Sequence, residues 1–180
     1  MMKSLAYLRR QEGILESLLE MLDYATLRLS RGKDVPPYML KELIELLQMY
    51  LDISHKTTSE MMATLLGYQS TDSTDCESDR RRAALRKYEL FLLKVVEAYD
   101  LGYDGAKWVF ARYAGRYISS LRQRLEGEKE ILPTWIEDRE QRDREILKKL
   151  KKINGEERRR RERAMARIES LKRELEKVAA

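Results

Sequence analysis

The chain of 180 residues is poor in the residue types that build disulfide scaffolds and common metal or catalytic sites, with one cysteine, one histidine, three prolines and eight glycines. A single cysteine, Cys76, excludes an internal disulfide, so we expect a protein of a reducing, cytoplasmic environment. One cysteine and one histidine are too few for a four-ligand structural zinc site. Any Cys–His or Ser–His catalytic pair would need His55, and we expect no enzyme.

Long apolar runs are missing as well. No stretch of 18 apolar residues is present, and the N-terminal MMKSLAYLRRQEG has no apolar centre, so neither a membrane span nor a signal peptide is predicted. What the chain has instead is 37% charged residues of both signs, mixed with many Leu and Ala. This composition favours helices, and we expect an all-α protein.

Apolar residues at helical spacing predict four long helices, over residues 3–30, about 36–67, about 78–99 and about 106–132. Gly32 is expected to end the first helix, Asp34 to cap the second, and Pro133 to end the fourth. The polar segment 70–79 is expected to be a loop. Four amphipathic helices with short connections predict an antiparallel up-down four-helix bundle over residues 1–133.

Residues 134–180 differ in charge. They hold 16 basic and 11 acidic residues, so they carry all of the formal net charge of +5. Their apolar residues still repeat at helical spacing, with a break expected at Asn154 and Gly155. We therefore predict a basic C-terminal extension of two helices that packs one face on the bundle and leaves a cationic face in water.

Polar residues interrupt the apolar stripe of each predicted helix. In an up-down arrangement these positions fall near the same end of every helix and should meet at one level of the bundle, which is where helix bundles build metal and cofactor sites. The interruptions, in chain order, are Gln11, His55, Ser59, Ser78, Arg124 and Glu128.

The order of helices and two stretches, DVPPYMLKELIELLQMYLDISH (34–55) and ISSLRQRLEGEKEILP (118–133), resemble the hemerythrin-like (HHE-type cation-binding) domain. The resemblance implies a non-haem di-iron centre held by single histidines in helices one and three and by a His-x-x-x-Glu pair in each of helices two and four. The family's ligand positions fall on the six interruptions. Two of the six expected ligands, His55 and Glu128, are retained.

The replacements argue against bound iron. Gln and Ser are weak donors, and Arg124 places a permanent positive charge where a cation would sit. We therefore expect no cofactor, with Arg124 standing in for the metal by pairing with Glu128 and hydrogen bonding to Gln11, His55 or Ser59. Two alternatives remain. Arg124 and Glu128 form only an exposed surface pair, or a reduced iron site that binds or senses oxygen or a related diatomic uses His55, Glu60, Glu128 and Glu130.

The cationic extension suggests a partner of opposite charge, either an acidic protein surface or RNA. The alternative is an ordinary solvated helix face, because acidic residues are interleaved through much of it. Arg80, Arg81, Arg82, Arg86 and Lys87 would extend the cationic patch if they lay on the same side. We expect an interaction or regulatory module. Its partner-binding candidates are Lys148, Lys149, Lys151, Lys152, Arg158, Arg159, Arg160, Arg161 and Arg163.

Overall fold

The computed structural model describes residues 3–66, 74–136 and 140–179, and among these it contains six α-helices and no strand. Side chains are described throughout these ranges except at 3, 5, 62, 65–66, 74–78, 130–136, 140–142 and 179. The expectation of an all-α protein is confirmed. The helices are α1 (Lys3–Ser30), α2 (Pro37–Leu66), α3 (Thr74–Asp100), α4 (Ala106–Ile136), α5 (Glu140–Glu156) and α6 (Arg158–Ala179).

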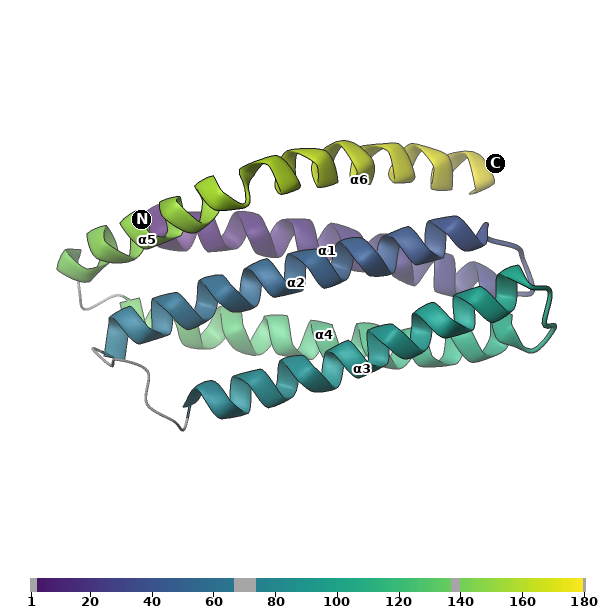
Figure 1. Cartoon of the computed structure of the whole chain (residues 1–180), viewed down its shortest axis with the longest axis horizontal. Helices are drawn as coiled ribbons and strands as arrows, with labels where there is room; N and C mark the ends of the chain where they lie inside the picture. Colours follow the sequence, from purple (N-terminus) through teal and green to yellow (C-terminus); the bar gives the residue numbers. More distant parts are fainter. Residues whose placement is uncertain (1–2, 67–73, 137–139, 180) are drawn as a thin grey trace.

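Helices α1 to α4 lie side by side along the long axis of the molecule, each running opposite to the one before it (Figure 1). α1 packs against α2 and α4, and α3 packs against the same two helices. α5 and α6 lie over α1 and α2, on the side away from α3. None of the described helices is long and apolar enough to cross a membrane.

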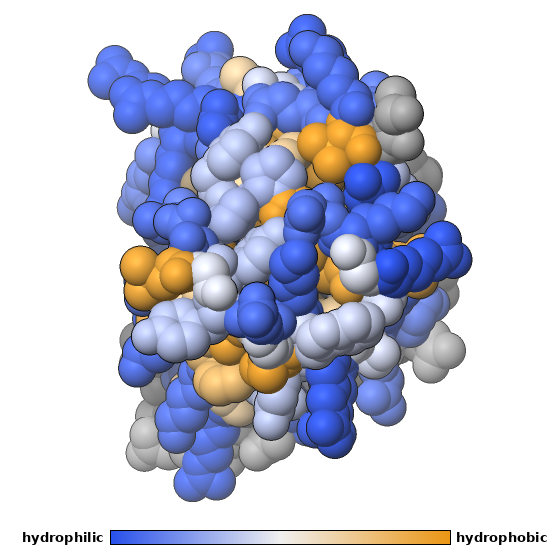
Figure 2. Space-filling model, turned by 90° about the vertical axis from the view of Figure 1, so that its right-hand side faces the viewer, coloured by the Kyte–Doolittle hydropathy of each residue, from blue (hydrophilic) through white to orange (hydrophobic). Residues whose placement is uncertain are grey.

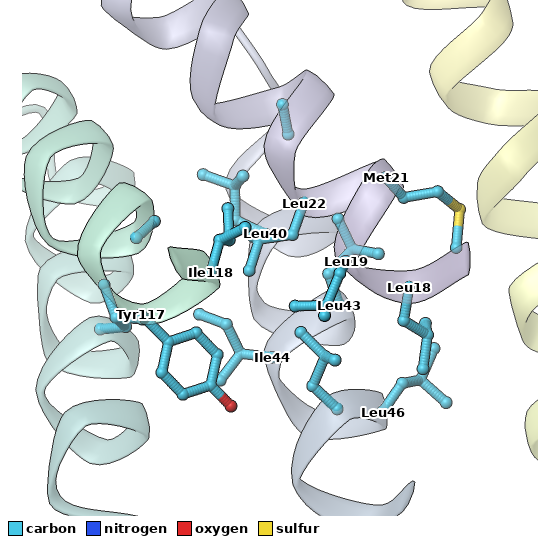
Figure 3. Close-up of a cluster of buried hydrophobic side chains, with 14 of the residues drawn as sticks. Leu18, Leu19, Met21, Leu22, Leu40, Leu43, Ile44, Leu46, Tyr117 and Ile118 are labelled. Atoms are coloured by element: carbon cyan, nitrogen blue, oxygen red, sulfur yellow. The ribbon is translucent and has the colours of Figure 1, made fainter. Parts of the chain in front are cut away.

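The core forms where the predicted apolar stripes meet. Large residues of α1, α2 and α4 fill the interior, among them Leu18, Leu22 and Leu43, each with no exposed surface (Figure 3). The tail contributes to the same core through Ile168 and Leu171. Burying a leucine contributes about 1.5 to 3 kcal/mol, so these stripes are the main favourable term in folding. Val109 on α4 is 38% exposed and lies outside this core.

Two glycines end helices in the same way. Gly32 has a φ of 73° and Gly102 a φ of 85°, a left-handed conformation that costs other residues more than glycine. After α1, the Lys33 amide donates to the Arg28 carbonyl and the Gly32 amide to Leu29, each at 3.0 Å. This pair of bonds satisfies carbonyls that the helix end would leave unpaired. The predicted end of the first helix at Gly32 is therefore confirmed.

Other boundaries differ from the prediction. α3 begins at Thr74, so residues 74–79 are helical, while 70–73 lie outside the described residues. α4 continues through Pro133 to Ile136, so the prediction that Pro133 ends the fourth helix is wrong. Asp34 lies too early to cap α2, and its carboxylate accepts hydrogen bonds from Lys107 and Tyr99 instead.

The break in the tail lies where it was expected to within three residues. α5 ends at Glu156 and α6 begins at Arg158. The apolar faces of both helices point inward, as Ile146, Leu150 and Leu175 are each less than 5% exposed. Each of these helices therefore buries one apolar face against other helices of the protein.

Candidate functional site

The predicted polar positions begin on α1 with Gln11, which is 6% exposed. Its amide nitrogen donates to the hydroxyl of Tyr7, one turn earlier, at 3.3 Å. The amide oxygen of Gln11 is buried and has no hydrogen-bond partner among the described residues. Gln11 therefore faces the interior, as the stripe predicted, but its one hydrogen bond stays within α1.

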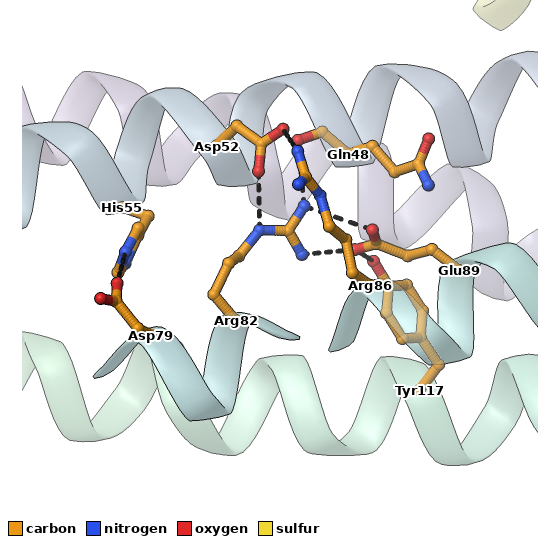
Figure 4. Close-up of polar contacts among 8 residues, drawn as sticks. All are labelled: Gln48, Asp52, His55, Asp79, Arg82, Arg86, Glu89 and Tyr117. Atoms are coloured by element: carbon orange, nitrogen blue, oxygen red, sulfur yellow. Dashed lines mark hydrogen bonds and ion pairs between the residues drawn. The ribbon is translucent and has the colours of Figure 1, made fainter. Parts of the chain in front are cut away.

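His55 on α2 points toward α3. Its Nε2 atom lies 2.9 Å from Oδ1 of Asp79, and the two side chains are 18% and 68% exposed (Figure 4). Ser59, one turn further along, is half-buried. Ser78 lies in α3, but its side chain is outside the described residues. The retained histidine thus has an acidic partner that the resemblance does not imply.

Arg124 and Glu128 form the predicted pair on α4, with 2.8 Å between Nε and Oε1. The two side chains are 20% and 21% exposed, so the pair is partly buried rather than a free surface pair. Nη1 of Arg124 is buried without a hydrogen-bond partner, and among the described residues no hydrogen bond joins Arg124 to Gln11 or Ser59. Arg124 therefore neutralises Glu128, and the expected hydrogen bonds to Gln11 and Ser59 are absent among the described residues.

The residues of the alternative iron site are engaged with different partners. Glu60 lies 3.6 Å from Nζ of Lys149, Glu128 pairs with Arg124, and His55 with Asp79. The side chain of Glu130 lies outside the described residues. No three His, Cys, Asp or Glu side chains with described positions gather as metal ligands. The amide, hydroxyl and guanidinium groups at the other expected positions do not fit an iron centre.

A buried ionic cluster that the sequence reasoning missed lies between α2, α3 and α4. Glu89 has no exposed surface and Arg82 is 5% exposed. Nη1 and Nη2 of Arg82 donate to the two carboxylate oxygens of Glu89 at 2.9 and 3.2 Å. Tyr117 on α4 donates its hydroxyl to the same carboxylate at 2.7 Å (Figure 4). The cluster satisfies both charges inside the protein.

The cluster continues to the surface through α2. Nε of Arg82 donates to Asp52 at 2.8 Å, and the exposed Arg86 donates to the other oxygen of Asp52 at 3.0 Å. The Gln48 carbonyl accepts a longer bond from Arg82, at 3.4 Å. Asp52–Arg82 and His55–Asp79 are thus neighbouring contacts between α2 and α3, three residues apart on each helix (Figure 4).

Burial and charge together set the protonation of this cluster. Burial alone would lower the pKa of Arg82, but the hydrogen bonds and charges of Glu89 and Asp52 outweigh it and raise that pKa. Burial, and then the adjacent Glu89 carboxylate, raise the pKa of Tyr117 far above its ordinary value. The Tyr117 hydroxyl therefore stays protonated and serves as a donor. The arrangement suits a structural link between three helices.

Arg82 does not extend the basic patch, because its side chain is buried rather than on the cationic side of the molecule. The signal was present in the α3 stripe, because Arg82 and Glu89 fall in line with the buried Leu85 and Leu92. An Arg and a Glu seven residues apart on an apolar stripe indicate a buried pair, since neither charge is tolerated alone in a core.

The cationic side chains of α5 and α6 are mostly exposed. Among the nine predicted partner-binding residues, three form ion pairs, Lys149 with Glu60, Arg158 with Glu162, and Arg160 with Glu157. Five others of the nine are exposed and have no ion-pair partner among the described residues. These five define what we call the cationic face, and they are Lys148, Lys151, Lys152, Arg159 and Arg163.

Arg161 differs from its neighbours because its guanidinium turns inward. Its Nη1 donates to the Tyr7 hydroxyl at 2.6 Å and to the Asn154 side chain, and its Cζ lies 5.5 Å from the centre of the Tyr7 ring. Nε and Nη2 are buried without hydrogen-bond partners. Arg161 therefore anchors the start of α6 on α1 and is not available to an external partner.

Comparison with protein-family models, with curated proteins and with solved structures finds no significant match to this chain.

Proposed function

We propose that the chain is a hemerythrin-like protein whose helices α1 to α4 form an antiparallel up-down bundle and whose metal site has been replaced by side-chain ion pairs. The support is the chemistry at the six ligand positions. The two retained ligands, His55 and Glu128, contact Asp79 and Arg124, and Arg124 supplies a positive charge beside Glu128 without a metal. In this proposal the protein is not an enzyme and holds no metal. The alternative is a protein that binds iron at a reduced site around His55 and Glu128.

The function that we propose is recognition of an acidic protein by the cationic face. The observation that carries it is the exposure of five unpaired Lys and Arg side chains on α5 and α6, while the apolar sides of these helices are fixed in the core. Residues 140–180 contain no Phe, Trp or Tyr, so the face offers no ring on which a base would stack. This favours an acidic protein surface over single-stranded RNA.

Binding to poly-L-glutamate, followed by fluorescence anisotropy at increasing salt, tests the proposal. We expect an affinity that falls steeply with salt, because exposed charges are screened. The test variant removes three charges from the cationic face by replacing Lys148, Lys151 and Lys152 with Gln. The control removes three charges from exposed residues of α1 and the loop after it that have no ion-pair partner among the described residues. In the control, Arg10, Arg31 and Lys33 are replaced with Gln.

We expect the test variant to weaken binding by about tenfold or more, which corresponds to about 1.4 kcal/mol, and the control by about twofold or less. Equal losses in the two variants would mean that only net charge matters and would contradict the proposal. A uridine 20-mer RNA serves as a second probe. If the RNA binds more tightly than poly-L-glutamate, the proposed partner class is wrong.

A further inference from the structure

Within the described part of the chain, α6 packs on one pair of helices and not on the opposite pair. α6 packs on α1 and α2, while α3 and α4 lie on the far side of the molecule (Figure 1). α6 docks by burying Leu171 and Leu175 and by pairing Arg167 with Glu42 at its edge. This fold therefore already contains a charged amphipathic helix that packs on a pair of helices. An ion pair at its edge, Arg167 with Glu42, accompanies the apolar contact.

The outer face of α3 and α4 carries apolar and aromatic side chains that remain in contact with water. Phe91 is 40% exposed and Val109 38%, although both are large apolar residues. Phe91 contacts Tyr113 across the two helices, with 4.7 Å between ring centres, and Tyr88 lies 6.3 Å from Tyr113. Helical spacing places Val109 one turn before Tyr113 on α4. We call these four residues the α3–α4 seam.

Positive charges surround the seam. Residues 80–122 hold ten Lys and Arg against four Asp and Glu. Helical spacing places two cations of α3 and two of α4 beside the apolar patch, and the Arg116 guanidinium lies 5.7 Å from the Tyr113 ring centre. All four are exposed and have no ion-pair partner among the described residues. They are Lys87, Lys94, Arg112 and Arg116.

The apolar seam and the cations beside it together indicate which kind of partner would bind there. A second copy of α6, or of the seam itself, would bring more positive charge and be repelled. The rings offer no flat face for bases, because Phe91 and Tyr113 are tilted by 60° and Arg116 lies over Tyr113. An apolar stripe flanked by carboxylates matches both features. We propose that the α3–α4 seam docks an acidic amphipathic helix of a partner protein.

The end of the molecule that holds the α3–α4 loop does not compete for this role. Leu101 and Tyr103 in that loop are 78% and 66% exposed. In the view onto this end, however, the apolar residues lie in small separate groups among hydrophilic side chains (Figure 2). The seam differs because its rings are in direct contact across two helices.

The test uses the full chain and a labelled synthetic helical peptide of 18 residues, with Leu at every third or fourth position and Glu on its flanks. A second peptide has Lys in place of every Glu. We expect the Glu peptide to bind at least about tenfold more tightly than the Lys peptide. Failure of the Glu peptide to bind, or equal affinity of the two peptides, would overturn the proposal.

Variants locate the binding site. Arg112→Glu with Arg116→Glu should weaken binding of the Glu peptide by about tenfold or more, and Phe91→Ala by about fivefold. Lys148→Glu with Lys151→Glu makes the same charge change on the cationic face and should alter binding by about twofold or less. All these positions are exposed, and unchanged melting temperatures establish that each variant folds. Loss of binding in the α5 variant but not in the seam variants would overturn the proposal.

The peptide experiment and the poly-L-glutamate experiment can fail separately, because the poly-L-glutamate assay uses substitutions outside the seam. Sedimentation equilibrium adds a further criterion. Self-association of the wild-type chain that Phe91→Ala abolishes would assign the seam to a second copy and would contradict an acidic partner helix.

Discussion

Arg82 and Glu89 lie two turns apart on α3 and form a two-point ion pair inside the protein, with N–O distances of 2.9 and 3.2 Å. Neither residue has more than 6% of its side chain exposed. A buried pair of this kind adds little stability over two well-packed apolar residues, but removal of one partner leaves an uncompensated charge. Its expected role is therefore to specify how α2, α3 and α4 meet.

Replacement of Arg82 by methionine should destabilise the protein by about 3 to 5 kcal/mol, because Glu89 would remain buried without its cation. Urea denaturation followed by circular dichroism measures the loss. Arg86→Met is the matched control, since Arg86 pairs with Asp52 at the surface and is 61% exposed. We expect less than about 1 kcal/mol from the control. Equal effects of the two substitutions would contradict the buried pair.

Tyr117→Phe should lower the free energy of unfolding by about 1.5 to 3 kcal/mol, because Glu89 loses a hydrogen bond to a charged acceptor. Tyr113→Phe removes the same atom one turn earlier. Its hydroxyl has no hydrogen bond among the described residues, and we expect a change below about 0.5 kcal/mol. The same urea experiment compares the two variants. A negligible effect of Tyr117→Phe would show that the hydroxyl does not support the cluster.

Two glycines of the α1 region should respond in opposite directions to alanine. Gly32→Ala places a side chain at a φ of 73° and should cost about 1 kcal/mol or more. Gly13→Ala lies inside α1, with no atom within 4 Å of the added methyl group, and should stabilise by about 0.5 to 1 kcal/mol. Thermal melting should therefore shift down for the first variant and up for the second. Shifts in the same direction would contradict the assigned helix end.

The stability of the protein should depend on pH through the side chain of Glu12. Burial raises the pKa of Glu12, a rise that Lys129 opposes and the nearby Glu128 and Glu16 carboxylates reinforce. An acid with a raised folded pKa binds its proton more tightly in the folded state, so its contribution to stability falls as pH rises from the unfolded to the folded pKa.

Glu12→Gln should accordingly stabilise the protein at neutral pH by less than about 1 kcal/mol, because part of the side chain remains in water. The gain should disappear below about pH 4, where both states are protonated. Urea denaturation of both proteins across this range provides the measurement. Lower stability of the variant at neutral pH would contradict the direction of the pKa shift.

Helix positions could largely be predicted from the sequence, because burial at a period of 3.6 residues leaves a direct pattern. Leu15, Leu22 and Leu43 are buried as their spacing indicates, and Gly32 ends α1 as its residue type indicates. The start of α3 could not be predicted, since Ser, Thr and Asp favour helix starts and loops alike. Pro133 was misleading, because α4 continues for three residues beyond it.

The polar interior was harder to predict, because one sequence does not show which charged residue turns inward. Arg124 was expected to be the buried cation, and it is partly buried with Glu128 as its partner. Arg82 is the more deeply buried arginine, and its partner lies two turns away on the same helix. The guanidinium of Arg161 turns inward to reach Tyr7 and Asn154. Tyr7 is distant from Arg161 in sequence, and Asn154 lies on the other side of the break between α5 and α6.

The most direct test of the claim that ion pairs have replaced a metal site is the iron content of two purified proteins grown with added iron. One is the wild-type chain, and the other restores the ligands that the family resemblance implies. We expect negligible iron in the wild type and about two iron ions per chain in the restored variant, with the near-ultraviolet absorption of ferric iron. Two iron ions per chain in the wild type, or none in the variant, would contradict the account. The restored variant carries Gln11→His, Ser59→Glu, Ser78→His and Arg124→His.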